Sequence, residues 1–284
     1  MKKLLIQLDG SPHPSVFDRV VAFDGGADEV MSYGGVTEAD VRDLVHGAIF
    51  TRGPKDLHHT AIFIGGTDMA AGERLLAAVR GTFFGPMRVS VMLDSNGSNT
   101  TAVAAVARMG KVVGELKGRR AVVTAGTGPV GMRAAGLLAK AGADVTLTSR
   151  RAAEPAFLEQ LVSRFGGTVR AAVLAEPAQA AAVLEGAEVI VSAGPAGVCM
   201  IPKTAWAGRP GLRAVADLNA VPPMGVEGVE VQDSAVEREG AVVYGALGVG
   251  SLKMKIHKAC IARLFERNDL VLDAETIADV ASQI

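Results

Sequence analysis

One turn near the middle of the chain constrains the fold more than any other feature. Residues 125–131 read AGTGPVG, between a strand-like run that ends at Thr124 and an amphipathic stretch. The spacing G-x-G-x-x-G is typical of the turn that holds a dinucleotide pyrophosphate at a helix N-terminus. We therefore predict a Rossmann-type domain over about residues 98–250; the alternative is a glycine-rich turn without a ligand. The expected pyrophosphate contacts are Gly126, Thr127, Gly128, Pro129, Val130 and Gly131.

Short apolar runs alternate with amphipathic stretches along the whole chain, which predicts parallel α/β structure. Hydrophobic residues make up 49% of the chain and aromatic residues only 4%, so small aliphatic side chains fill the interior. A last long helix, expected from about Val249 to Glu266, returns the chain to its first part. We expect two domains: a doubly wound, Rossmann-type domain at 98–250 and a smaller parallel α/β domain at 1–97 with 251–284.

Composition excludes several classes of partner. The net charge is −1 with acids and bases interspersed, which argues against a nucleic-acid or membrane surface. Two cysteines, Cys199 and Cys260, are too few for a disulfide framework and lack metal-ligand spacing. No apolar run approaches the ~18–20 residues of a membrane span. We expect a soluble, cytoplasmic protein without a metal site.

The end of the second strand of the Rossmann-type domain predicts which dinucleotide binds. Sites for NAD commonly carry an acid there, but residues 147–151 read LTSRR. A hydroxyl and two guanidinium groups, at Ser149, Arg150 and Arg151, suit the 2′-phosphate of NADP. We predict NADP, with NAD possible; the alternative is that the arginines, Arg151 above all, are solvated loop charges.

Later strand ends supply further expected cofactor contacts. Ser192, Ala193 and Gly194 follow one strand, and Asp217 and Asn219 follow another. Small residues before the last long helix would let the nicotinamide carboxamide reach the backbone; they include Ala246 and Gly248. Simple turn chemistry explains each of these groups equally well.

The sequence lacks obvious machinery for proton transfer. Neither tyrosine, Tyr33 or Tyr244, stands in a Tyr-x-x-x-Lys pair, and no histidine belongs to a recognisable triad. Oxidation of an alcohol needs a general base, because a proton leaves together with the hydride. Oxidation of a carbon between two nitrogens needs none, since the nitrogen lone pairs delocalise the resulting cation. The absence therefore favours an aminal substrate.

Long strings of this chain resemble a known family, the NADP-dependent methylene-tetrahydromethanopterin dehydrogenases of methylotrophic bacteria. The strings are PSVFD (14–18), DGGAD (24–28), DMAAGER (68–74), FFGP (83–86), MLDSNGSNTT (92–101), AGTGPVGMR (125–133), GALG (245–248) and LKMKIHKACIARLFE (252–266). The resemblance implies reversible oxidation of a methylene-bridged pterin to the methenyl form in one-carbon metabolism. Tetrahydromethanopterin carries the carbon unit, and some members also accept the tetrahydrofolate analogue. It also implies an N-terminal substrate domain, a pterin in the cleft, and a homo-oligomer, with a trimer suspected.

The resemblance places substrate and catalytic roles on particular residues. Lys255 would stand beside the reacting carbon at the start of the last long helix; the alternative is that the lysines there only solvate a helix face. Residues expected to bind the pterin are Asp18, Asp94, Ser95, Asn96, Asn99, Lys253 and His257. The string Ser149-Arg150-Arg151 differs from the Gly-Arg-Lys of other members, so dual use of NAD stays open. The competing functions are a shikimate-type dehydrogenase, which needs a Lys–Asp relay, and a non-catalytic NADP sensor.

Overall fold

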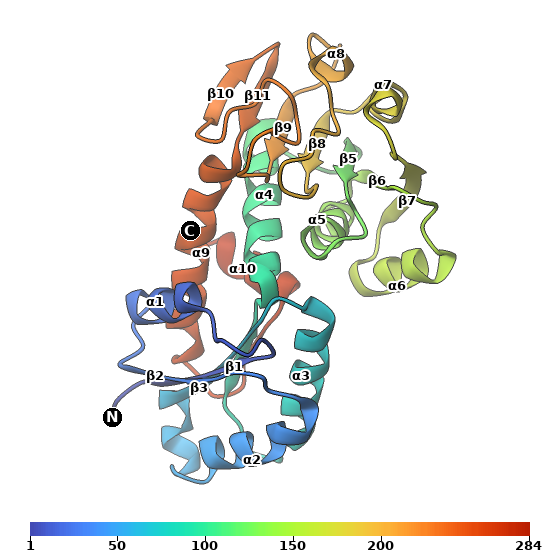
Figure 1. Cartoon of the computed structure of the whole chain (residues 1–284). Helices are drawn as coiled ribbons and strands as arrows, with labels where there is room; N and C mark the ends of the chain where they lie inside the picture. The colour runs from blue at the N-terminus through green and yellow to red at the C-terminus, as the bar shows by residue number, and fades with distance from the viewer. The chain divides into compact units, whose positions relative to one another are not determined.

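A computed structural model describes all 284 residues, which form two compact units. The terminal unit comprises residues 1–100 and 254–284, and the central unit comprises residues 101–253. The chain passes from one unit to the other within two helices, α4 (Ser98–Val113) and α9 (Ala246–Leu264). Each unit has its own sheet and its own helices (Figure 1).

The sheet of the terminal unit has five parallel strands in the order β2-β1-β3-β4-β12. This doubly wound order has its switch point between β1 and β3, where ligands of such sheets bind at the carboxyl ends of the strands. The bounds are β1 (Leu4–Asp9), β2 (Glu29–Tyr33), β3 (Thr60–Gly65), β4 (Ser90–Leu93) and β12 (Val271–Leu272).

Helices cover both faces of this sheet. Figure 1 shows α1 on one face, with α2 and α3 on the other. Thr37 and Asp40 form a capping box at the start of α2, and the Asp68 carboxylate accepts two N–H groups at the start of α3. The helices are α1 (Val16–Asp24), α2 (Glu38–Ile49), α3 (Met69–Thr82) and α10 (Ala274–Ala281), with 3₁₀ turns η1 (Pro54–His59) and η2 (Ser95–Gly97).

The central unit has a seven-stranded sheet, β10-β11-β9-β8-β5-β6-β7. Six of its strands are parallel, and when these six alone are numbered along the chain their order in the sheet is 3-2-1-4-5-6, the order of dinucleotide-binding domains. The prediction of a Rossmann-type fold beside a second parallel α/β unit is therefore confirmed. The bounds are β5 (Arg120–Thr124), β6 (Asp144–Ser149), β7 (Thr168–Val173), β8 (Val189–Ser192), β9 (Ala214–Asp217), β10 (Ser234–Arg238) and β11 (Ala241–Tyr244).

The helices of the central unit pack closely on one another and on the sheet. A Cβ on Gly136 of α5 would lie 2.3 Å from the ring of Phe165, so the glycine lets α5 lie directly against α6. The Trp206 side chain is buried in a core under β8 and β9, and its indole N–H donates to the Glu227 carbonyl. The helices are α5 (Pro129–Lys140), α6 (Pro155–Phe165), α7 (Ala180–Val183) and α8 (Lys203–Trp206), with the 3₁₀ turn η3 (Pro177–Gln179).

Candidate functional site

The turn between β5 and α5 is a candidate phosphate site and is called the cradle below. Helix α5 begins with Gly128 as N-cap and Pro129 in its first position, and no side chain caps it. The N–H groups of its first turn therefore remain available to an anion, which the helix dipole also favours. The hydroxyl of Thr124, at the end of β5, is buried and has no hydrogen-bond partner. Sequence reasoning missed this unsatisfied buried hydroxyl.

The three glycines of the cradle differ in what surrounds them. A Cβ on Gly131 would lie 2.3 Å from the Ala125 carbonyl oxygen, and one on Gly126 would lie 2.5 Å from the Leu147 Cβ. Packing alone therefore requires glycine at these two positions. A Cβ on Gly128 would meet only the Ala125 oxygen, at 3.3 Å. Space kept open at Gly128 fits a pyrophosphate that approaches the backbone.

A cavity of about 610 Å³ opens at the carboxyl end of β6. Both Arg150 and Arg151 line it, are exposed, and form no ion pair, while Thr127 reaches it from the cradle. The Ser149 hydroxyl donates to the Arg151 carbonyl and so orders the turn. Glu154 also lines the cavity. The cationic surplus at this strand end fits a dianionic phosphate.

Most of the side chains expected to contact the cofactor at the ends of β8 and β9 are buried in the protein. The buried Asp217 carboxylate accepts the N–H groups of Asn219 (3.1 Å) and Val226 (2.8 Å), and burial raises its pKa. Ser192 is also buried and adjoins Asp217 beneath Gly225. These side chains hold the loops in place. Ala193 and Gly194 are half-buried, and a Cβ on Gly194 would meet nothing within 4 Å, so a ligand can approach there.

The small residues near Ala246 lie inside helix α9, which corrects the expected start at Val249. A Cβ on Gly248 would lie 2.0 Å from the Asp233 carbonyl oxygen, so close approach of a neighbouring loop explains this glycine. The Arg108 guanidinium donates to the Gly248 carbonyl (3.3 Å) and lies over the Tyr244 ring (5.2 Å). A contact of Ala246 or Gly248 with the nicotinamide stays a prediction.

In the terminal unit, two carboxylates lie near Gly65, at the switch point between β1 and β3. A Cβ on Gly65 would lie 3.3 Å from Asp9 Oδ2 and 3.4 Å from Asp18 Oδ2. Asp9 also accepts the N–H group of Ser15 (3.1 Å), the N-cap of α1. This contact fixes the start of α1, which carries Asp18, over the carboxyl ends of the strands. Asp18 is half-buried, and contact of its carboxylate with the pterin stays a prediction.

Three of the four residues expected in the loop after β4 are buried. Asp94 accepts the N–H (3.0 Å) and the hydroxyl (2.6 Å) of Thr100. Ser95 donates to the Gly65 carbonyl, and Asn99 donates to the Leu93 carbonyl. Their side chains therefore shape the strand ends rather than present free hydrogen-bonding groups. Only Asn96 is exposed, at a positive φ of 56°.

The buried His257 of α9 lies against the same loop. Its Nδ1 is 3.9 Å from Asp94 Oδ2, and its ring stacks on Phe63 at 5.5 Å and 18°. The ring of Phe17 lies 6.5 Å from it and is 48% exposed, an aromatic surface that sequence reasoning missed. One signal was available, since Phe17 directly precedes Asp18 in the string PSVFD.

Only one of the two lysines before His257 lies near its face of the helix. Helical residues advance about 100° each, so Lys253 lies about 40° from His257, while Lys255 lies about 200° from both. Lys255 is exposed on the far face. Lys253 therefore lies near the face of His257 and Lys255 does not, while the role of Lys255 beside the reacting carbon stays a prediction. Both lysines lie in the middle of α9, not at its start.

Comparison with known proteins identifies the family. A bifunctional protein named MdtA, from Methylorubrum extorquens, is 50% identical over 285 residues, which cover 100% of this chain and 99% of that protein. The NAD(P)-dependent methylenetetrahydromethanopterin dehydrogenase of the same organism is 32% identical over 295 residues, with 100% and 99% covered. The chain belongs to the methylene-tetrahydromethanopterin dehydrogenase family. The resemblance found in the sequence is thus confirmed.

Two further comparisons bear on this dehydrogenase. The family profile described as methylene-tetrahydromethanopterin dehydrogenase, N-terminal, matches residues 16–96, which all lie in the terminal unit and include Asp18 and Asp94. Shikimate 5-dehydrogenase from Listeria monocytogenes, solved with shikimate and NAD, gives a TM-score of 0.60 at 13% identity, covering 98% of this chain and 96% of that one. At this identity the likeness shows the fold alone. No helix is long and apolar enough to span a membrane, and no three His, Cys, Asp or Glu side chains cluster as metal ligands.

Proposed function

We propose that this dehydrogenase oxidises methylene-tetrahydromethanopterin to the methenyl form by hydride transfer to NADP. The observation that carries the proposal is the open cradle at Gly128 beside a cationic cavity, in a chain that belongs to this family over its full length. Without the cationic cavity, the cradle would bind NAD and NADP equally well.

The central unit would hold the cofactor through three groups of its own. First-turn N–H groups of α5 would bind the pyrophosphate, and the Arg150 guanidinium would form paired hydrogen bonds with the 2′-phosphate. Ser149 orders the turn that carries Arg150, and Ala193 and Gly194 offer backbone groups at the next strand end. Bound NADP supplies the carbon that accepts the hydride.

The terminal unit would hold the pterin at the carboxyl ends of its strands. The Asp18 carboxylate can accept the N–H groups of the 2-amino-pyrimidinone edge of a pterin. Phe17 offers a ring on which the flat pterin can stack, supported by His257 and Phe63 behind it. Asn96 is the exposed amide of the loop after β4 and can bind the opposite edge.

The charges at this sheet end suit the reaction. Loss of hydride leaves a cation spread over two nitrogens, so no base is required. The carboxylates of Asp9, Asp18 and Asp94 surround the strand ends and favour the developing positive charge. The positive charge of a lysine would repel the cation that forms. Lys253 would therefore act by donating a hydrogen bond that orients a substrate carbonyl.

A rate assay tests the proposal. Purified protein is mixed with NADP or NAD and with the methylene forms of tetrahydromethanopterin and tetrahydrofolate, and the absorbance of the methenyl product is followed. We expect turnover with NADP and the methanopterin, faster than with NAD, and turnover also with the folate analogue. The proposal fails if neither pterin yields a methenyl product with either cofactor.

We also propose that the enzyme acts in the cytoplasm as a homo-oligomer, with a trimer as the expected state. Sedimentation equilibrium gives the mass of the assembly directly. A monomeric mass at the concentrations used for the rate assay would contradict this part.

A further inference from the structure

The terminal unit has a cavity that the proposed function leaves without a role. Its volume is about 340 Å³, within the range of small-molecule sites. Its lining comes from the end of α3 and from the segments that lead into β4 and β12. Because these segments precede the strands, the cavity lies at the amino edge of the sheet, opposite to Asp18 and Asp94. The string FFGP at residues 83–86 lies here.

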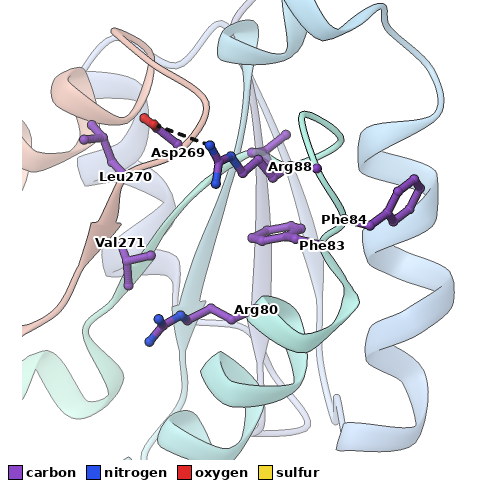
Figure 2. Close-up of a pocket in the computed structure, with 9 residues that line it drawn as sticks. Arg80, Phe83, Phe84, Arg88, Asp269, Leu270 and Val271 are labelled. Atoms are coloured by element: carbon purple, nitrogen blue, oxygen red, sulfur yellow. Dashed lines mark ion pairs between the residues drawn. The ribbon is translucent and has the colours of Figure 1, made fainter.

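The lining of this cavity carries excess positive charge. Arg80 lines it and forms no ion pair, while Arg88 Nη2 lies 3.8 Å from Asp269 Oδ2, beyond hydrogen-bond distance. Asp269 already accepts two hydrogen bonds of 2.8 Å from Arg267, and this pairing holds the pKa of its carboxyl below the ordinary value. The negative charge of Asp269 is thus paired with the guanidinium group of Arg267. Arg80 is therefore unpaired, and Arg88 has only the long ion pair with Asp269 that Figure 2 marks, so both guanidinium groups have hydrogen-bond donors left for a ligand.

An aromatic ring separates the two cations. Figure 2 shows the Phe83 ring between Arg80 and Arg88, with Leu270 and Val271 across the cavity. Phe84 is turned the other way and packs against Phe50, with ring centroids 5.9 Å apart. The wall therefore offers a flat apolar surface flanked by two planar donors.

We propose that this cavity binds a small organic dianion with a flat apolar body, of the class of aryl phosphates. Each guanidinium would take a pair of phosphate oxygens, and the ring of the ligand would lie on Phe83. The last turn of α3 also favours a cation at Arg80 through the helix dipole, but that effect accounts for neither Arg88 nor the cavity. Strand β4 separates this site from the carboxyl edge, so the ligand would not displace a pterin.

Calorimetric titration of the full chain with phenyl phosphate tests the proposal. The titration is done in the Arg150→Ala background and with NADP in excess, which removes the cradle as a competing phosphate site. Arg80→Gln and Arg88→Gln are compared with Arg42→Gln, whose exposed guanidinium pairs with Asp43 on α2 away from the cavity. Thermal midpoints confirm that each variant folds. Hydrogen exchange locates the bound ligand.

We expect saturable binding that each cavity arginine strengthens about tenfold or more, with Arg42→Gln unchanged. Phenyl phosphate should bind more tightly than inorganic phosphate, and Phe83→Leu should abolish that preference. Exchange protection is expected over residues 80–90 and 267–272. The proposal is overturned by a lack of saturable binding, by equal affinity in all three arginine variants, or by protection confined to other segments.

Discussion

Two glycines of the β5–α5 turn are needed for different reasons, and alanine substitutions separate them. A Cβ on Gly131 would lie 2.3 Å from the Ala125 oxygen and 2.9 Å from the Gly126 Cα, and neither backbone atom can give way. A Cβ on Gly128 would meet only the Ala125 oxygen at 3.3 Å, and the φ of −79° and ψ of 168° there suit alanine. Gly131→Ala should therefore damage the fold, and Gly128→Ala should damage the cofactor site.

The magnitudes follow from these contacts. Overpacking against rigid atoms costs about 1–3 kcal/mol or more, and about 1 kcal/mol lowers Tm by roughly 2–4 °C in a chain of this size. Gly131→Ala should lower Tm by about 5–10 °C. For Gly128→Ala, a weaker N-cap lowers the free energy of unfolding by about 0.5–1 kcal/mol. The reduced conformational freedom of the unfolded chain raises it by about 0.4–1 kcal/mol. Its Tm should change by at most about 4 °C, while its NADP affinity falls at least tenfold.

Thermal unfolding followed by circular dichroism gives Tm, and calorimetric titration gives the Kd for NADP. Gly47→Ala on α2 is the matched control, because a Cβ there would meet nothing within 4 Å. It should raise Tm slightly and leave NADP binding unchanged. The reasoning is refuted if Gly128→Ala binds NADP like the unmodified protein, or if it loses as much stability as Gly131→Ala.

Arg150→Ala should weaken NADP binding by roughly tenfold to a hundredfold and NAD binding by less than twofold, because only NADP carries the phosphate; equal losses in calorimetric titrations would contradict this. Lys253→Met should lower turnover at least tenfold and Lys255→Met should not, in steady-state assays; the reverse result would return the role to Lys255. Burial, aided by the charge of Asp94, raises the pKa of the Cys260 thiol to about 12. Iodoacetamide at pH 8 should therefore label Cys260 only after unfolding, as mass spectrometry can measure.

Much of the fold could be predicted because its determinants are local. The glycine turn, the capping residues Thr37 and Asp68, and the apolar runs each mark an element within a few residues. Two strands could not be predicted in this way. Strand β10 (Ser234–Arg238) is a largely exposed antiparallel edge strand without an apolar run, and β12 (Val271–Leu272) is only two residues long. Both are defined by a partner strand, which a local pattern does not contain.

The site was harder to predict, because polar residues after a strand look alike whether they face a ligand or hold the loop. Nothing local separates Asp18, which lies half-buried near Gly65, from Asp94 and Asn99, which bind their own loop.

The two lysines are a different case, since their signal is in the sequence. Ile256, Cys260 and Leu264 recur at intervals of four and are buried, which defines the inner face of α9. Lys253 is three residues before Ile256 and lies near that face, whereas Lys255 is in phase with the exposed Ser251 and Ala262. The helical period over the whole of α9 therefore favours Lys253, whereas motif spacing alone does not distinguish the two lysines.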